Sequence, residues 1–127
     1  MAINIMEKFA ASGDRLWEIV GTPDRVDWVP GVESCDYDGD VRRLAMPGAG
    51  DIEERILSLD GRAMRIEYSC IKSAAPLDHH LASIEVKPDG DSCVMHWATE
   101  VRPAEFEPFI EQSMQGCLAR LHELLDG

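Results

Sequence analysis

Hydrophobic and polar residues alternate at the start of the chain. Ile3 and Ile5 stand on either side of Asn4, and the segment runs on to Phe9. This period of two is typical of a strand with one face in the core. We therefore predict a first strand over residues 2–10.

The pattern then changes to one that predicts two short helices. Ser12 is a favourable helix N-cap and Gly21 a favourable stop, so residues 13–20 are predicted as a helix. Pro23 suits the first position of a second short helix, which would end at residues 30–31.

Clusters of turn-forming residues recur at regular intervals in the middle of the chain. They are Asp38-Gly39-Asp40, Pro47-Gly48-Ala49-Gly50, Asp60-Gly61 and Pro88-Asp89-Gly90-Asp91. The runs between them are typical of strands and cover residues 32–37, 41–46, 51–59, 62–71, 77–87 and 92–102. Because the connections are short, we expect an antiparallel meander rather than parallel strands joined by helices.

A long amphipathic helix is predicted at the end of the chain. From Pro103 onward, hydrophobic residues recur at helical spacing over about 20 residues. The predicted fold class is therefore α+β, with a seven-stranded antiparallel sheet, two short helices after the first strand and a long C-terminal helix. A length of 127 residues is near the common size of one domain, so we expect a single domain over residues 1–127.

The charge of the chain argues against some classes of partner. It has 24 acidic and 12 basic residues, which gives a net charge of -12. Nucleic acids and anionic lipid surfaces attract clustered Lys and Arg, so neither is an expected partner. No stretch approaches the roughly 18 apolar residues of a membrane helix, and residues 1–11 lack the pattern of a signal peptide. We expect a cytoplasmic protein without membrane insertion.

The sequence contains no clear motif for binding a metal or a cofactor. The four cysteines are widely spaced, with no Cys-x-x-Cys pair and no His at zinc-ligand spacing. His79 and His80 are adjacent on a predicted strand, so they project to opposite faces and cannot share one ion. The chain also lacks a phosphate-binding glycine loop and a nucleophile elbow. We predict no metal site and no cofactor.

Several local patterns resemble one family. They are LWEIVG at 16–21, WVPGVESC at 28–35, VRRL at 41–44, IEERI at 52–56, YSCI at 68–71, ASIEVKP at 82–88 and the strand around Trp97. With the order of elements, they resemble the START-like (SRPBCC) superfamily and, within it, the bacterial polyketide cyclase/dehydrase-type proteins. The resemblance implies a helix-grip fold, in which a curved sheet wraps around the terminal helix and leaves a cavity. Members include lipid carriers, hormone receptors and cyclases, so the fold does not settle the function.

Two polar residues are expected to face that cavity. Alternation along the predicted strands places Tyr68 and His80 inward, where they could share one wall. Many proteins of the resembled subgroup carry a tyrosine at the position of His80. The pair could orient a ligand carbonyl, and a neutral imidazole could act as a general base. Alternatively, both side chains only satisfy their polar tips inside the core.

A third polar candidate lies in the neighbouring hairpin. Arg42 or Arg43 is expected to pair across it with Glu54. A buried arginine could steady an enolate oxygen, as ketide chemistry requires. Exposed cross-strand pairing is the more common arrangement.

The remaining candidates are hydrophobic. The residues expected to border the cavity, either as ligand contacts or as plain core, are Trp28, Trp97, Phe106, Ile110, Met114 and Cys117. Sequence alone does not separate these two roles.

Three functions are compatible with this pattern. The leading hypothesis is binding of a small hydrophobic or aromatic molecule, such as a lipid, a polyketide-like compound or an isoprenoid, oriented by Tyr68, His80 and Arg42. The alternative is a polyketide cyclase/dehydrase-like enzyme, in which His80 abstracts a proton and Tyr68 or Arg42 stabilises the enolate. A second alternative is an accessory protein with a filled pocket that contacts a partner through its sheet. An edge strand could also support a homodimer.

Overall fold

Seven strands form one antiparallel sheet in the computed structural model, which describes residues 2–47 and 50–126. The strands are β1 (Ala2–Phe9), β2 (Ser34–Tyr37), β3 (Val41–Ala45), β4 (Ile52–Asp60), β5 (Arg65–Lys72), β6 (His79–Asp89) and β7 (Ser92–Arg102). Their spatial order is β1-β7-β6-β5-β4-β3-β2. Consecutive strands from β2 to β7 therefore pair as the predicted meander, and β1 pairs with β7.

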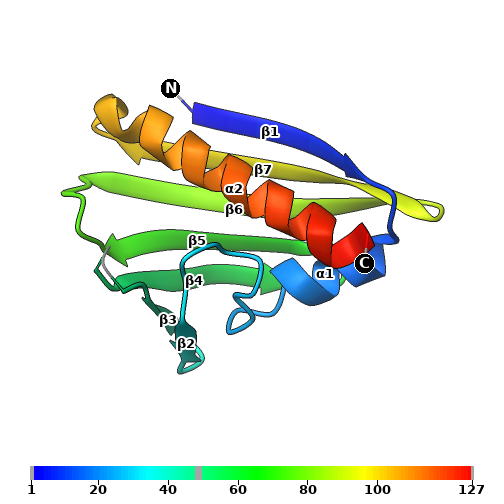
Figure 1. Ribbon diagram of the computed structural model, residues 1–127, viewed down its shortest axis with the longest axis horizontal. Coiled ribbons are helices and arrows are strands. Elements are labelled where there is room, and N and C mark those ends of the chain that lie inside the picture. Colours follow the sequence, from blue (N-terminus) through cyan, green and yellow to red (C-terminus); the bar gives the residue numbers. More distant parts are fainter. Residues whose placement is uncertain (1, 48–49, 127) are drawn as a thin grey trace.

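The long helix α2 (Glu107–Asp126) lies diagonally across one face of this sheet (Figure 1). Its buried residues are Met114, Cys117, Leu118, Leu121 and Leu125, which recur at the helical spacing seen in the sequence. They pack against the inward side chains of the strands to form the hydrophobic core. Burying one leucine fully, as at Leu121, contributes roughly 1.5–3 kcal/mol. The α+β helix-grip prediction is confirmed.

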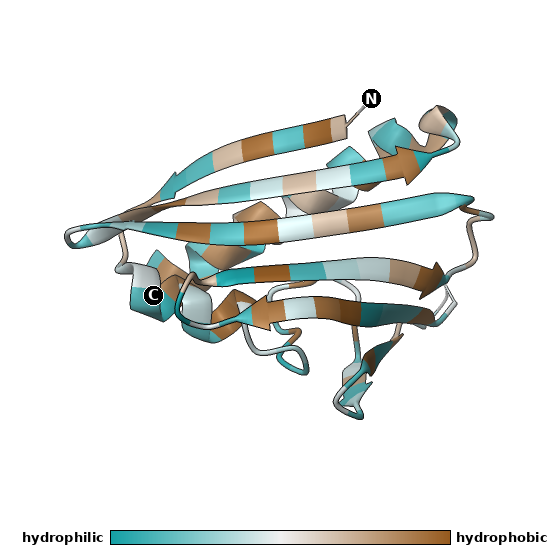
Figure 2. Cartoon of the chain, turned by 180° about the vertical axis from the view of Figure 1, so that it is seen from behind, coloured by the Kyte–Doolittle hydropathy of each residue, from teal (hydrophilic) through white to brown (hydrophobic). Residues whose placement is uncertain are grey.

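Alternation along the central strands decides which side chains reach that core. In β5, Ile66 and Tyr68 are buried, and in β6 the buried residues are Ala82, Ile84 and Val86. Figure 2 shows the same sheet from behind, with hydrophobic and hydrophilic residues alternating along the strands. The face assignment made from sequence for β5 and β6 therefore agrees with the structure.

The short helix α1 (Gly13–Val20) has the predicted bounds. The backbone N–H of Arg15 donates to the hydroxyl of Ser12 at 3.2 Å, which caps the helix as expected. At its other end the helix stops at Gly21, where a side chain would overlap the indole of Trp17. The helix packs against β6 and β7.

The second short helix predicted from Pro23 does not form, and residues 22–31 make a run of turns instead. A helix needs its carbonyls for backbone N–H groups four residues later. Here the Arg25 carbonyl accepts from Trp28 Nε1 at 3.0 Å, and the Pro23 carbonyl accepts from Arg42 Nη1 at 3.2 Å. The backbone bonds of this segment also span three residues rather than four, as from the Val29 N–H to the Val26 carbonyl, so they form turns and not a helix.

Smaller differences concern the ends of elements. Asp60 accepts backbone N–H bonds from Arg62 and Ala63, which forms a turn and delays β5 to Arg65. A short 3-10 helix (Ala104–Phe106) precedes α2, so the α-helix begins later than Pro103. The predicted Pro47–Gly50 turn includes residues 48 and 49, which lie outside the described residues.

Candidate functional site

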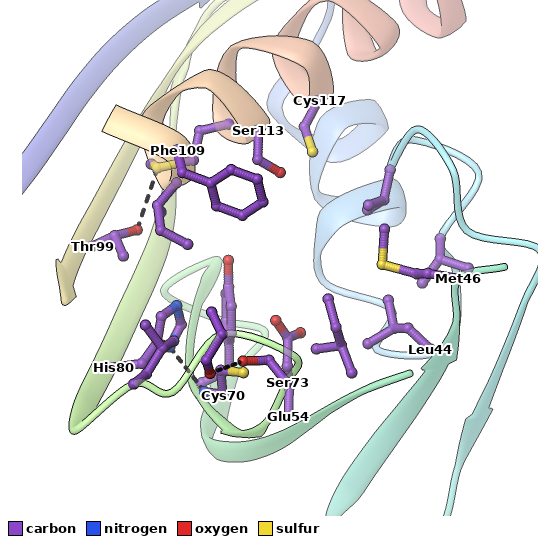
Figure 3. Close-up of a pocket in the computed structure, with 18 of the residues that line it drawn as sticks. Leu44, Met46, Glu54, Cys70, Ser73, His80, Thr99, Phe109, Ser113 and Cys117 are labelled. Carbon is purple, nitrogen blue, oxygen red and sulfur yellow. Dashed lines mark hydrogen bonds between the residues drawn. The ribbon is translucent and has the colours of Figure 1, made fainter. Parts of the chain in front are cut away.

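A pocket of about 250 Å³ lies between α2 and the sheet. Its wall includes most of the residues singled out from the sequence: Trp28, Arg42, Glu54, Tyr68, His80, Trp97, Ile110, Met114 and Cys117. These residues come from the 22–31 turns, from strands β3 to β7 and from α2. The fold therefore brings distant parts of the sequence together around one hollow (Figure 3).

Phe106 is not among the residues that line this pocket, and Phe109 takes the place expected for it. Phe106 belongs to the short 3-10 helix, whereas Phe109 lies in the first turn of α2. The Phe109 side chain remains 64% exposed, so it forms part of the pocket rim.

Arg42 and Glu54 form a buried ion pair at the pocket wall. They are directly opposite each other in the β3–β4 register, and Arg42 Nε donates to Glu54 Oε1 at 2.8 Å. The guanidinium also donates to the Pro23 carbonyl and lies 4.8 Å from the centre of the Tyr68 ring. Arg42 is 4% exposed, so its charge is almost completely withdrawn from solvent.

The exposed cross-strand pairing considered from sequence applies instead to the neighbouring Arg43. Its guanidinium lies 3.1 Å from Asp38 and 3.9 Å from Glu53 on the other face of the sheet, with a side chain that is 46% exposed. Strand alternation separates the two arginines. Only Arg42 can act on the pocket.

The ion pair keeps Arg42 charged despite its burial. Burial by itself lowers the pKa of Arg42, but the Glu54 carboxylate and Tyr68 oppose it, so the pKa is raised overall. A buried guanidinium of this kind depends on its partner, because an unpaired charge in the core is costly. Glu54 is thus both the partner of Arg42 and a wall residue.

Tyr68 is held in place by Trp97. The indole Nε1 of Trp97 donates to the Tyr68 hydroxyl at 3.1 Å, and the indole ring packs 5.6 Å from Trp28. Burial raises the pKa of Tyr68, and the charge of Glu54 raises it further. Tyr68 is therefore a neutral phenol whose own proton remains available to donate.

His80 is fixed by the strand next to it. The backbone N–H of Cys70 donates to His80 Nδ1 at 2.9 Å, and the imidazole lies 6.0 Å from the Tyr68 ring. The Ser69 hydroxyl donates to the His80 carbonyl, which adds a second link between β5 and β6. Burial lowers the pKa of His80, although the charge of Glu54 opposes this effect.

Some wall residues were not anticipated. The segment after β5 contributes Ser73, Ala74, Ala75 and Leu77, and the Ser73 hydroxyl donates to the Ala75 carbonyl at 2.8 Å. Cys70 and Ser113 also border the pocket (Figure 3). Cys70 follows Tyr68 by two positions, so the alternation that placed Tyr68 inward already contained the signal for it.

The pocket combines a mainly apolar wall with a few polar groups. The polar wall groups include the Tyr68 hydroxyl, the His80 imidazole and the hydroxyls of Ser73, Thr99 and Ser113, and the charged wall residues are Arg42 and Glu54. Within residues 2–47 and 50–126, no three His, Cys, Asp or Glu residues are grouped so that they could hold a metal ion. No helix of the described chain is long and apolar enough to cross a membrane.

Three solved structures illustrate how widely this fold occurs. An uncharacterized protein from Bacillus thuringiensis has a TM-score of 0.91 at 20% identity, with 100% of both chains covered. A START superfamily protein from Mycobacterium smegmatis has a TM-score of 0.81 at 14% identity, covering 98% of this chain and 97% of that one. Truncated norcoclaurine synthase from Thalictrum flavum has a TM-score of 0.77 at 22% identity, covering 98% and 92%.

At the level of sequence, no curated protein matches the chain. The model of one protein family, described as polyketide cyclase/dehydrase and lipid transport, matches residues 6–126. This match spans nearly all of the chain and agrees with the START-like architecture. The chain therefore belongs to the polyketide cyclase/dehydrase and lipid transport family.

Proposed function

We propose that the protein reversibly binds a small hydrophobic or aromatic molecule in the pocket between α2 and the sheet. The observation that carries this proposal is an apolar hollow of about 250 Å³ into which only a few fixed polar groups point. Ligand sites are typically built in this way. The volume is below the roughly 300–1,000 Å³ of pockets for drug-sized molecules, so it suits a ligand of one or two rings.

The family and the fold support the same proposal. Lipid transport is part of the family description, and norcoclaurine synthase has been crystallised with dopamine and hydroxybenzaldehyde, which are small aromatic molecules. The match over residues 6–126 also supports the proposal that the whole chain is one binding domain.

The geometry of His80 favours binding over proton abstraction. Because Nδ1 accepts the Cys70 N–H, the neutral imidazole carries its proton on Nε2 and presents a donor. Serving as a base at Nε2 would require the proton on Nδ1, where it would face the Cys70 N–H. His80 is thus arranged to hold a ligand acceptor such as a carbonyl oxygen.

Arg42 is similarly ill suited to stabilise an enolate. One of its N–H groups is bonded to Glu54 and another to the Pro23 carbonyl, and the adjacent carboxylate offsets its charge. A buried cation that is already paired offers little free charge to a developing oxyanion. The cyclase/dehydrase-like enzyme therefore remains the weaker candidate.

The proposal is tested by native mass spectrometry of protein purified from its own host, followed by denaturing analysis of any released molecule. A direct test uses naphthalene, with binding followed by calorimetry. Cys117→Phe should fill the pocket and abolish naphthalene binding, because Cys117 is a buried wall residue. Ala119→Phe, on the exposed side of α2, is the matched control and should bind as the wild type does. Equal binding by both variants would contradict the pocket as the site.

A further inference from the structure

Glu54 uses one carboxylate oxygen for Arg42 and leaves the other for the pocket. The described residues supply one side-chain hydrogen bond to it, from Arg42 Nε to Oε1. The Glu54 side chain is 17% exposed while that of Arg42 is 5% exposed, so the carboxylate is the more accessible half of the pair. Figure 3 shows the Glu54 carboxylate directed into the hollow.

The cationic half is covered on several sides. Arg42 contacts Glu54, the Pro23 carbonyl and the face of the Tyr68 ring. A ligand entering the pocket therefore meets a carboxylate rather than a guanidinium. Because Glu54 is the more exposed partner, the ion pair offers a hydrogen-bond acceptor to the ligand. Farther from the pair, the opposite charges of Arg42 and Glu54 largely cancel.

The negative charge of Glu54 also raises the pKa values of neighbouring side chains. Burial raises the pKa of the Cys70 and Cys117 thiols, that of Cys117 to about 12, and Glu54 raises both further. Glu54 likewise adds to the raised pKa of Tyr68, where Arg42 only partly opposes it. The pocket thus disfavours anions of its own side chains, and the same field acts on an anionic ligand.

We propose that the pocket selects ligands whose polar end is a hydrogen-bond donor, namely a hydroxyl or an amino group received by the free oxygen of Glu54, and that it rejects carboxylates. This inference rests on the proposed function and narrows it. Small aromatic or alicyclic alcohols, phenols and amines fit the description. Fatty acids and other apolar carboxylates do not, because their charge would face that of Glu54 in a poorly solvated space.

The test compares compounds that share one ring system. Naphthalene, 2-methoxynaphthalene, 2-naphthol, (2-naphthyl)methylamine and 2-naphthoate are titrated into the wild-type protein and followed by calorimetry. We expect 2-naphthol to bind about tenfold more tightly than 2-methoxynaphthalene, because only the hydroxyl donates to a charged acceptor. The ammonium group of (2-naphthyl)methylamine is also a donor, so this compound should bind more tightly than 2-methoxynaphthalene, and 2-naphthoate should bind most weakly.

Glu54→Gln provides the second arm. This substitution leaves Arg42 without its counter-charge, so the preference should reverse: 2-naphthoate should gain about tenfold and the advantage of 2-naphthol should shrink. Glu53→Gln is the matched control, since Glu53 pairs with Arg43 and Lys72 outside the pocket. It should keep the wild-type order of affinities.

The possible failures are distinguishable. Equal binding of 2-naphthol and 2-methoxynaphthalene to the wild type, or tightest binding of 2-naphthoate, would overturn the role of Glu54 while leaving the pocket a binding site. If none of the compounds binds, naphthalene included, the proposed function fails and this inference fails with it. Should Glu54→Gln not fold, the wild-type series alone decides between these outcomes.

Discussion

The backbone N–H of Cys70 points at Nδ1 of His80 across the β5–β6 pair, with 2.9 Å between the two nitrogens. A backbone amide cannot change its role, because it always donates. The imidazole must therefore accept at Nδ1, and in its neutral form it carries the proton at Nε2. The pairing of β5 and β6 thus sets the tautomer of His80 in the pocket.

Protonation of His80 should destabilise the fold. Burial lowers the folded-state pKa of His80 below the value of about 6.5 for an unperturbed histidine. Between these two pKa values the unfolded chain binds more protons, so the free energy of unfolding should fall as the pH drops below about 6.5. Urea unfolding at a series of pH values between about 7.5 and about 5.5, one unit on either side of this reference, measures the loss.

Two variants separate the contribution of His80 to this loss of stability from that of carboxylates, which titrate at lower pH. His80→Gln should reduce the loss over this range, because Gln has no proton to gain. His96→Gln, at a histidine whose ring nitrogen contacts Asn4 away from the pocket, is the control and should retain the loss. An unchanged pH profile in His80→Gln would show that His80 is not the group responsible.

Strand alternation was enough to find much of the candidate site. It placed Tyr68 and His80 inward, and the hairpin placed Glu54 within reach of Arg42 or Arg43. This succeeds because a strand has only two faces and a buried sheet hides one of them. The side-chain register then follows from the hydrophobic residues on either side.

Other parts of the site depend on contacts that no local pattern encodes. In the turns of residues 22–31, Trp28 and Arg42 donate to backbone carbonyls, and the Arg42 contact comes from strand β3. Phe106 and Phe109 differ because a 3-10 turn precedes α2 and changes the phase of its apolar face. The tautomer of His80 depends on a backbone amide of another strand. The contacts of Arg42 and His80 are tertiary, whereas the Trp28 bond and the 3-10 turn before α2 are local features that the hydrophobic pattern does not reveal.

Removing one partner of the buried ion pair should be strongly destabilising. Arg42→Met leaves Glu54 without its cation at the pocket wall, and we expect the free energy of unfolding to fall by about 3–5 kcal/mol. Replacing both partners, as in Arg42→Met/Glu54→Leu, should recover most of that loss, because the pair is then exchanged for apolar packing. Arg43→Met should cost less than about 1 kcal/mol, because the Arg43 side chain is 46% exposed and its ion pairs are solvated. A double variant no more stable than Arg42→Met would contradict this account.

Removing the Tyr68 hydroxyl, a change of one heavy atom, should lower the free energy of unfolding. Tyr68→Phe leaves the indole N–H of Trp97 without its acceptor in the core, and an unsatisfied buried donor costs about 1–3 kcal/mol. Tyr37→Phe, in the four-residue strand β2 at the end of the sheet, is the control. Chemical denaturation should separate the two variants. If Tyr68→Phe is as stable as the wild type, a water or a rearranged indole must satisfy Trp97.

Phe109 and Phe106 should differ in their effect on ligand affinity. Phe109 lines the pocket while being 64% exposed, so a bound ligand would cover part of a ring that the empty protein leaves in solvent. Phe109→Ser should weaken 2-naphthol binding about fivefold, through lost apolar contact. Its unfolding free energy should stay within about 0.5 kcal/mol of the wild type, because little of the ring is packed in the empty protein. Phe106→Ser is the matched substitution one helical turn earlier and should leave the affinity unchanged. If Phe106→Ser weakened binding and Phe109→Ser did not, the ligand would lie against the 3-10 turn instead of the rim of α2, and the assignment made from the sequence would be the better one.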